Sequence, residues 1–152
     1  MNGFLLDTNI LSELRKQDRC DPGVRAWFDQ CPEGQLYVSV LVLGEIRRGI
    51  ERIRARDRRQ SEAMETWLES ITQGYEERLL HVDRRVADHW GALGAHRPIA
   101  PVDGLLAATA LAHQLTLVTR NVADVESTGV KILNPFSQPP PRTQPGGPPR
   151  RP

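Results

Sequence analysis

Residues 4–14 read FLLDTNILSEL, and this stretch contains the pattern that sets the fold. Its three leading apolar residues form a short run that ends at Asp7. Apolar residues then recur at Ile10, Leu11 and Leu14, which is the spacing of one face of a helix. The stretch therefore predicts a short strand, an acidic residue at its carboxyl end and a helix directly after it.

The same alternation of strand and helix continues along the chain. Further strands are predicted at 36–40, 79–82, 115–119 and 130–133. Helical apolar patterns lie at about 42–53, 59–73, 86–93 and 104–114. Strands that alternate with helices are typical of βαβ units. We therefore expect an α/β protein with a mostly parallel five-stranded sheet and helices on both of its faces.

Composition favours a single globular domain. The chain has 152 residues, of which 39% are hydrophobic, and this is enough for one core and too little for two substantial domains. Seven of the last 15 residues are proline, so we expect a domain over 1–137 and an extended or disordered tail over 138–152. With only two cysteines, no signal peptide and no membrane-spanning apolar run, the sequence indicates a cytoplasmic protein without a disulfide framework.

Basic residues are concentrated in one segment. Of the 20 lysines and arginines, 18 are arginine, and seven of these fall between Arg47 and Arg59. The guanidinium group binds phosphate well, so this segment is a candidate contact for a polyanion. The alternative interpretation is a solvated flank of a helix.

Four acidic residues are candidates for one functional site. Asp7 follows the first strand, Asp103 opens the alanine-rich helix and Asp124 lies just beyond the fourth strand. Glu45 lies one turn into the helix after the second strand, at the edge of its apolar face. In an open parallel sheet, ligands bind at the carboxyl ends of the strands, so these carboxylates are expected to converge there.

Each acid also has a simpler interpretation when it is taken alone. Asp7 and Asp103 could be helix caps, Glu45 could reach solvent, and Asp124 occupies a turn-like Asn-Val-Ala-Asp stretch. Taken together, several carboxylates in one crevice would repel each other unless a cation were bound. Oxygen ligands without clustered cysteine or histidine favour Mg²⁺ or Mn²⁺ over zinc.

Other chemistry finds little support in the sequence. The chain has four histidines, at His81, His89, His96 and His113. Their spacing is not that of metal ligands, and no acidic residue lies at an offset that would indicate a catalytic pair. The chain has no glycine-rich phosphate loop and no Gly-x-Ser-x-Gly motif. An aspartyl-phosphate phosphatase would need a second acid two residues after Asp7, where this chain has Asn9.

Five motifs together resemble a known family. They are LLDTNILS (5–12), GEIRRG (44–49), VDGLLAATA (102–110), VTRNVAD (118–124) and ILNPF (132–136). In this order and spacing they are similar to a PIN-domain ribonuclease of the VapC/FitB type, the toxin half of a bacterial type II toxin–antitoxin pair. The resemblance covers residues 1 to about 136 and implies a PIN-like three-layer sandwich.

The resemblance also implies roles for individual residues. One or two Mg²⁺ or Mn²⁺ ions would be held by Asp7, Glu45, Asp103 and Asp124. These acids would be supported by Thr8, Asn9, Thr119 and Asn121. The implied activity is endoribonuclease hydrolysis by a metal-activated water, which leaves a 5′-phosphate and a 3′-hydroxyl and inhibits translation and growth.

The implied partners are an RNA substrate and a cognate antitoxin, with a homodimeric toxin inside a larger toxin–antitoxin assembly and no membrane. The antitoxin groove would be bordered by Ile10, Leu11 and Leu14 on the first helix and by Arg47 and Arg48 on the arginine-rich helix. Two alternatives remain open. One is a PIN-fold module that binds RNA or a partner without cutting, and the other is a metal-dependent phosphatase or DNA nuclease.

Overall fold

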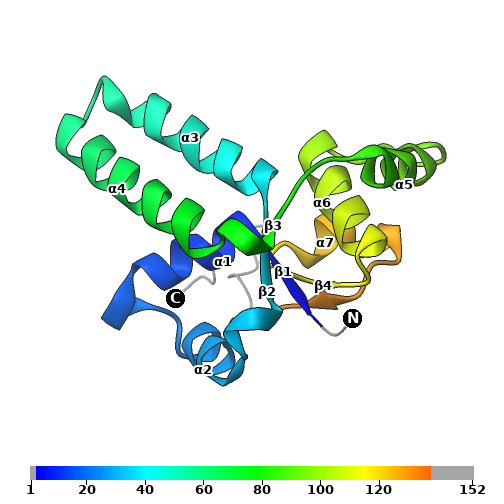
Figure 1. The fold of residues 1–152 in the computed structure, drawn as a ribbon, viewed down its shortest axis with the longest axis horizontal. Helices are drawn as coiled ribbons and strands as arrows, with labels where there is room; N and C mark the ends of the chain where they lie inside the picture. The colour runs from blue at the N-terminus through cyan, green and yellow to red at the C-terminus, as the bar shows by residue number, and fades with distance from the viewer. Residues whose placement is uncertain (1–2, 138–152) are drawn as a thin grey trace, which may run out of the picture.

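A computed structural model describes residues 3–137 of the chain (Figure 1). Five strands form one sheet in the order β3-β2-β1-β4-β5, and every neighbouring pair is parallel. The strands are β1 (Phe4–Leu6), β2 (Leu36–Ser39), β3 (Leu79–Leu80), β4 (Thr116–Val118) and β5 (Ile132–Leu133). The chain builds outward from β1 to β3 and then returns to the other side of β1, so the strand order reverses between β1 and β4.

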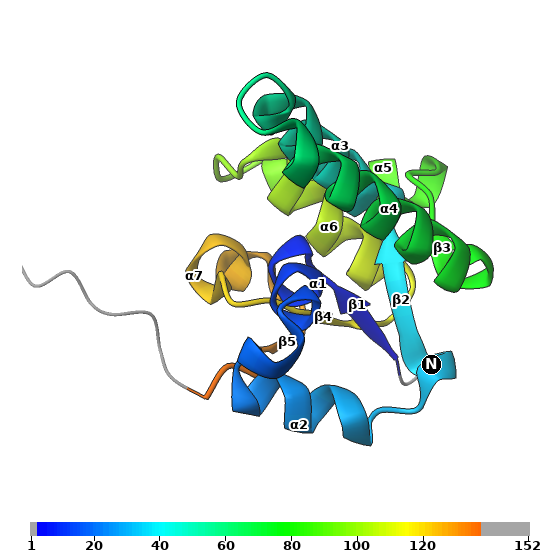
Figure 2. The ribbon, with the colours of Figure 1, turned by 90° about the vertical axis from the view of Figure 1, so that its left-hand side faces the viewer.

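Helices cover both faces of this sheet. The α-helices are α1 (Thr8–Arg15), α2 (Pro22–Gln30), α3 (Val40–Arg54), α4 (Arg58–Gly74), α5 (Arg84–Gly94), α6 (Pro101–Ala112) and α7 (Val122–Val125). Short 3-10 turns lie at Gln17–Arg19, Glu33–Gln35, Glu76–Arg78 and Glu126–Thr128. In the two perpendicular views of Figures 1 and 2, α3 and α6 lie above the strands and α2 lies below them. The predicted α/β sandwich with a parallel sheet is thereby confirmed.

The core is centred on β1 and on the alanine-rich helix α6. Leu5 and Leu6 are fully buried, and so are Ala107 and Ala110. Small side chains let α6 approach the sheet closely, while Leu106, which is 1% exposed, fills the space beside them. Each fully buried leucine contributes about 1.5–3 kcal/mol through removal of apolar surface from water. The central strand and α6 therefore hold the layers together.

The five predicted strands are all present, but local capping shortens some of them. The second strand ends at Ser39 rather than at residue 40, because the Ser39 hydroxyl accepts a hydrogen bond of 3.1 Å from the Leu41 N–H and caps α3. Helix α6 begins at Pro101 instead of Gly104, since proline at the first helical position has no N–H to leave unpaired. Asp103 consequently lies within the first turn of α6.

The sequence analysis was wrong about two other segments. It predicted no helix between the first helix and the second strand, whereas Pro22 opens α2 there. The Asp21 side chain caps this helix by accepting hydrogen bonds from the N–H groups of Gly23 and Val24. The turn-like stretch around Asp124 also forms a short helix, α7.

Some expectations drawn from composition can be compared with the structure. Within residues 3–137, no helix is both long and apolar enough to cross a membrane. Cys20 and Cys31 are free thiols, in agreement with the absence of a predicted disulfide framework. The predicted tail over 138–152 lies outside the described residues.

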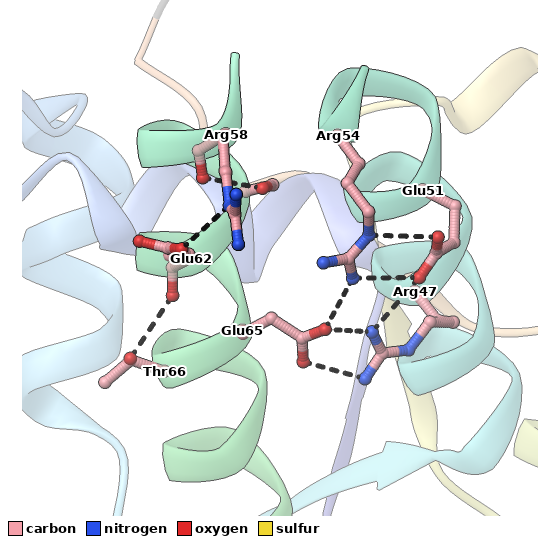
Figure 3. Close-up of polar contacts among 8 residues, drawn as sticks. Arg47, Glu51, Arg54, Arg58, Glu62, Glu65 and Thr66 are labelled. Carbon is pink, nitrogen blue, oxygen red and sulfur yellow. Dashed lines mark hydrogen bonds and ion pairs between the residues drawn. The ribbon is translucent and has the colours of Figure 1, made fainter. Parts of the chain in front are cut away.

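Helices α3 and α4 lie side by side and are joined by a network of ion pairs (Figure 3). Glu65 of α4 accepts hydrogen bonds from Arg47 at 2.9 Å and from Arg54 at 2.8 Å, both on α3. Arg54 also pairs with Glu51 at 3.0 Å. These hydrogen bonds lower the pKa of the Glu65 carboxyl to about 2.

The network divides the arginine-rich segment into two sets. Arg47, Arg54 and Arg58 each pair with a glutamate, which supports the interpretation of a solvated helix flank for this set. The other set consists of Arg48, Arg52, Arg56 and Arg59. Within the described part of the chain, none of these arginines forms an ion pair. Only this second set keeps its charge free for a polyanion.

Glu65→Gln should slightly lower the melting temperature, because it removes the charge shared by Arg47 and Arg54. The Glu65 carboxyl has a pKa below its usual 4.5, so its stabilisation is present above pH 4.5 and is lost as the pH falls toward 2. The difference from the parent should also vanish in 1 M NaCl, since exposed ion pairs are screened. Glu69→Gln, also on α4, is the control. An effect unchanged by salt would contradict an electrostatic origin.

Candidate functional site

The predicted site residues gather where the strand order reverses. Asp7 follows β1 and Thr119 follows β4, and these two strands are neighbours at the centre of the sheet. The Asp7 N–H donates to the Val118 carbonyl at 3.0 Å, which continues the strand pairing to the sheet edge. Crevices at such reversal points are the usual ligand sites of open α/β sheets.

Asp7 is held in a fixed position by its neighbours. One carboxylate oxygen accepts a 2.7 Å hydrogen bond from the Thr8 N–H, so Asp7 is the cap of α1 as one simple interpretation expected. The other oxygen accepts hydrogen bonds from the Thr119 hydroxyl at 2.8 Å and the Asn9 amide at 3.3 Å. Asp7 is only 8% exposed, and burial raises its pKa despite these hydrogen bonds. Capping therefore does not exclude a second role for this acid.

Glu45 is brought to Asp7 from a distant part of the sequence. The Thr8 hydroxyl donates a 2.8 Å hydrogen bond to a Glu45 oxygen, and this contact joins the first turn of α1 to α3. Desolvation raises the pKa of Glu45, and the charges of Asp7 and Asp103 raise it further. The simpler interpretation, that Glu45 only reaches solvent, is therefore wrong.

Asp103 and Asp124 complete the acidic cluster from the other side. Burial raises the pKa of Asp103, and the nearby charges of Asp124 and Asp7 add to this shift. Asp124 lies on α7 and is exposed, so it contributes negative charge from the rim of the site. The four predicted acids thus come from the cap of α1 and from α3, α6 and α7, and their charges act on neighbouring acids.

The predicted supporting residues form a polar layer behind the acids. The Thr119 hydroxyl accepts hydrogen bonds from the Asn121 N–H at 3.0 Å and the Asn9 amide at 3.2 Å. The side-chain amide oxygen of Asn9 accepts a hydrogen bond from the backbone N–H of Arg120 at 3.1 Å. Thr119 is almost fully buried, so these contacts set the orientation of the Asp7 carboxylate.

Three of the four predicted acids line a pocket of about 420 Å³, whereas Asp124 and the supporting residue Thr119 are not among its lining residues. Its predicted members are Asp7, Thr8, Asn9, Glu45, Asp103 and Asn121. The sequence analysis missed its other members, which are Ser12, Glu13, Lys16, Arg120 and Phe136. A signal for three of them was present, since Ser12, Glu13 and Lys16 continue the polar face of α1 that Asn9 begins at helical spacing. Arg120 and Phe136 lie within the quoted motifs VTRNVAD and ILNPF, but no role was assigned to them, because only the sheet topology brings them to the pocket.

The donor set of the pocket fits a hard divalent cation. Burial raises the pKa of Asp7, Glu45 and Asp103, and the charges of neighbouring acids raise it further, so a bound positive charge would relieve this repulsion. Within residues 3–137, no three acidic, histidine or cysteine side chains surround a point closely enough to form a complete cage. Mg²⁺ commonly keeps several waters and takes one or two carboxylates, so a partly hydrated ion suits this arrangement.

Only part of the predicted partner groove lies at the surface of the structure. Ile10 and Leu11 are 0% and 2% exposed and belong to the hydrophobic core, because the apolar face of α1 packs on the sheet. Arg47 is held by Glu65 on the α3–α4 pair. A surface pocket of about 270 Å³ does adjoin α1, and two of the predicted residues, Leu11 and Leu14, line it. The remaining apolar lining consists of Phe28 of α2 and of Trp67, Ile71 and Tyr75 of the α4 region.

These features define an α/β protein with an acidic pocket at the reversal point of a parallel sheet. A model of the PIN domain family matches residues 4–123. The chain is therefore a member of the PIN domain family, as the sequence motifs predicted.

Individual relatives agree with this assignment. The chain is 33% identical over 139 residues to VapC ribonuclease Y4jK of Sinorhizobium fredii, covering 88% of this chain and 97% of that protein. It is 31% identical to toxin FitB of Neisseria gonorrhoeae, covering 88% and 98%. The crystal structure of FitAcB from N. gonorrhoeae matches with a TM-score of 0.79 and 29% identity over 89% of this chain and 99% of that one. DNA-bound VapBC from Salmonella typhimurium matches with a TM-score of 0.69 and 26% identity over 88% and 98%.

In the metal-free protein, Asp103→Asn should raise the melting temperature by a few degrees at pH 7. The raised pKa means that folding disfavours the ionised carboxyl, so the gain should decline as the pH falls toward 3.8. Mg²⁺ should stabilise the parent by mass action and stabilise the variant much less. Asp88→Asn on α5 is the control. A variant that melts below the parent at pH 7, with no response of either protein to Mg²⁺, would contradict the cation site.

Proposed function

We propose that this protein is a Mg²⁺- or Mn²⁺-dependent endoribonuclease, the toxin of a type II toxin–antitoxin module that inhibits translation and growth in the cytoplasm. The observation that carries the proposal is the convergence of Asp7, Glu45 and Asp103 on one pocket, each with a raised pKa. Relatives that span nearly the whole domain are named as a VapC ribonuclease and a FitB toxin, which supports this activity.

Each side chain has a distinct role in the proposal. Asp7 and Asp103 are the direct metal ligands, and Asp124 adds negative charge from the rim. Glu45, fixed by the Thr8 hydroxyl, is either a ligand or a base that acts through water. Thr119 and Asn9 keep the Asp7 carboxylate turned toward the pocket, while Asn121 steadies Thr119 through its N–H.

A divalent cation at these carboxylates lowers the pKa of a bound water and offsets charge on the scissile phosphate. The chain contributes the fixed orientation of its acids and a pocket open enough to admit a polynucleotide backbone. Because water rather than the ribose 2′-hydroxyl is the nucleophile, the expected products carry a 5′-phosphate and a 3′-hydroxyl.

Asp7→Asn should reduce RNA cleavage by about 100-fold or more, since a metal ligand is worth several kcal/mol of transition-state stabilisation. Cleavage of a mixed RNA substrate is measured with Mg²⁺ and then with EDTA, with Asp88→Asn as the control. DNA and p-nitrophenyl phosphate are assayed in parallel.

RNA cleavage near the parent rate in Asp7→Asn would refute the site. Activity only on DNA or on the small ester would identify the alternative nuclease or phosphatase, and RNA binding without cleavage would identify the inert module.

The proposed module includes a cognate antitoxin bound to a homodimeric toxin. Support comes from the relative named toxin FitB and from the matched structures of FitAcB and of DNA-bound VapBC. On this chain, the pocket beside Leu14 and Trp67 offers apolar side chains to an amphipathic segment. Apolar anchors dominate binding energy at interfaces, so this surface supplies most of the proposed affinity.

Leu14→Asp should weaken binding of the antitoxin by about tenfold or more while the domain stays folded, because a buried charge opposes apolar contact. Affinity is measured by calorimetry with the protein encoded beside this gene, at low and high Mg²⁺. Leu14→Met, which preserves apolar volume, is the matched control. Affinity that survives Leu14→Asp but falls as Mg²⁺ rises would instead show that the antitoxin competes with the metal at the acids.

A further inference from the structure

Arg120 brings a positive charge to the acidic pocket. It directly follows Thr119, and its side chain lines the pocket together with Asp7, Glu45 and Asp103. Its guanidinium carbon lies 4.6 Å from the centre of the Phe136 ring, within the range of a cation–π interaction. The planar donor group is therefore held against an aromatic face at the wall of the pocket.

The guanidinium has no acidic partner in the described part of the chain, although acids line the same pocket. Among the residues that the structure describes, Arg120 forms no ion pair within 4 Å, and its buried Nε has no hydrogen-bond partner. Buried donors without partners are rare in proteins, because losing water without a replacement costs free energy. Because no acidic side chain of the described residues pairs with it, the guanidinium group is available to an acceptor from another molecule.

The other cation of the pocket is already engaged. Lys16 pairs with Glu13 at 2.7 Å, and Glu13 also accepts a hydrogen bond from the Asp21 N–H at 2.9 Å. This contact ties the lysine to the α1–α2 connection. Arg120 is thus the better candidate to receive an anionic group in the pocket.

The Phe136 platform is fastened to the domain by a specific contact. The Ser137 N–H and hydroxyl donate to the two Asp21 carboxylate oxygens at 3.0 and 2.8 Å. Gly23 allows the segment to lie this close, since a Cβ there would be 2.4 Å from the Pro135 carbonyl oxygen. The segment before the tail is therefore anchored at the start of α2, and Phe136 is fixed beside Arg120.

We propose that Arg120 binds an RNA phosphate beside the carboxylate cluster and that Phe136 orients its guanidinium for this contact. The inference rests on the proposed ribonuclease function. It explains how an anionic substrate can bind near four acids that repel it. A guanidinium suits this role because two of its N–H groups can donate to one phosphate at once.

The test measures RNA binding without cleavage. The Asp103→Asn protein, purified with its full chain, is titrated into a fluorescein-labelled single-stranded RNA over a series of salt concentrations. Adding Arg120→Gln should weaken binding about tenfold or more and reduce the slope of log affinity against log salt by about 0.7. Arg120→Lys should keep the slope and lose part of the affinity, because it keeps the charge without the fork.

Two further variants separate binding from folding. Arg120→Met removes the charge but keeps an apolar stem on Phe136, so it should reproduce the loss of slope even if Arg120→Gln folds poorly. Phe136→Leu should keep the slope and weaken binding several-fold, since the charge remains without its platform. Arg84→Gln on α5 is the control for general loss of positive charge, and melting curves confirm folding of every variant.

Three outcomes bear on the proposal. If Arg120→Gln and Arg120→Met fold and bind RNA with the parent's slope of log affinity against log salt, the proposed phosphate contact is wrong. If, in that case, the variants change only the affinity for Mg²⁺, Arg120 serves only to balance the charge of the acids. If no variant or parent binds RNA, this proposal and the proposed function both fail. If the slope changes as expected but the wild-type chain cuts no RNA, the phosphate contact stands and the ribonuclease function fails.

Discussion

The buried carboxylate of Asp7 is the constraint on which the rest of the site depends. An ionisable group that is 8% exposed between two central strands is costly unless hydrogen bonds compensate it. Its partners, Thr8, Asn9 and Thr119, come from the start of α1 and the end of β4. The pairing of β1 with β4 is therefore needed both for the sheet and for the carboxylate. Changes that separate these strands would disturb the core and the pocket together.

Charge is used in two different ways in this domain. On α3 and α4, arginines and glutamates are exposed and neutralise one another, which joins two helices at the surface (Figure 3). In the pocket, burial raises the pKa of Glu45 and Asp103, the charges of neighbouring acids raise it further, and neither acid forms an ion pair within the described residues. The first arrangement is neutralised within the chain, whereas the second leaves negative charge unpaired, as the proposed cation site requires. This contrast distinguishes the candidate site from the rest of the charged surface.

Local signals in the sequence were sufficient for most elements and failed where one residue type has two uses. Strand and helix periods located all five strands, because buried parallel strands are short apolar runs. Helix α2 was missed because a proline can either end one helix or begin another, and the cap contacts of Asp21 show that Pro22 begins one. The face of α1 was identified correctly as apolar, but its burial under the sheet, not a partner, explains Ile10 and Leu11.

The sequence by itself determined the class of fold, the four acids and their likeness to the PIN domain family, because these depend on residue type and spacing along the chain. Only the tertiary structure decided which side chains share the pocket. Arg120 and Phe136 meet because β4 and β5 pair and because Asp21 holds Ser137. Glu45 meets Thr8 across 37 positions of sequence. Such contacts depend on strand order and helix packing, and neither is encoded in the residues near the contact.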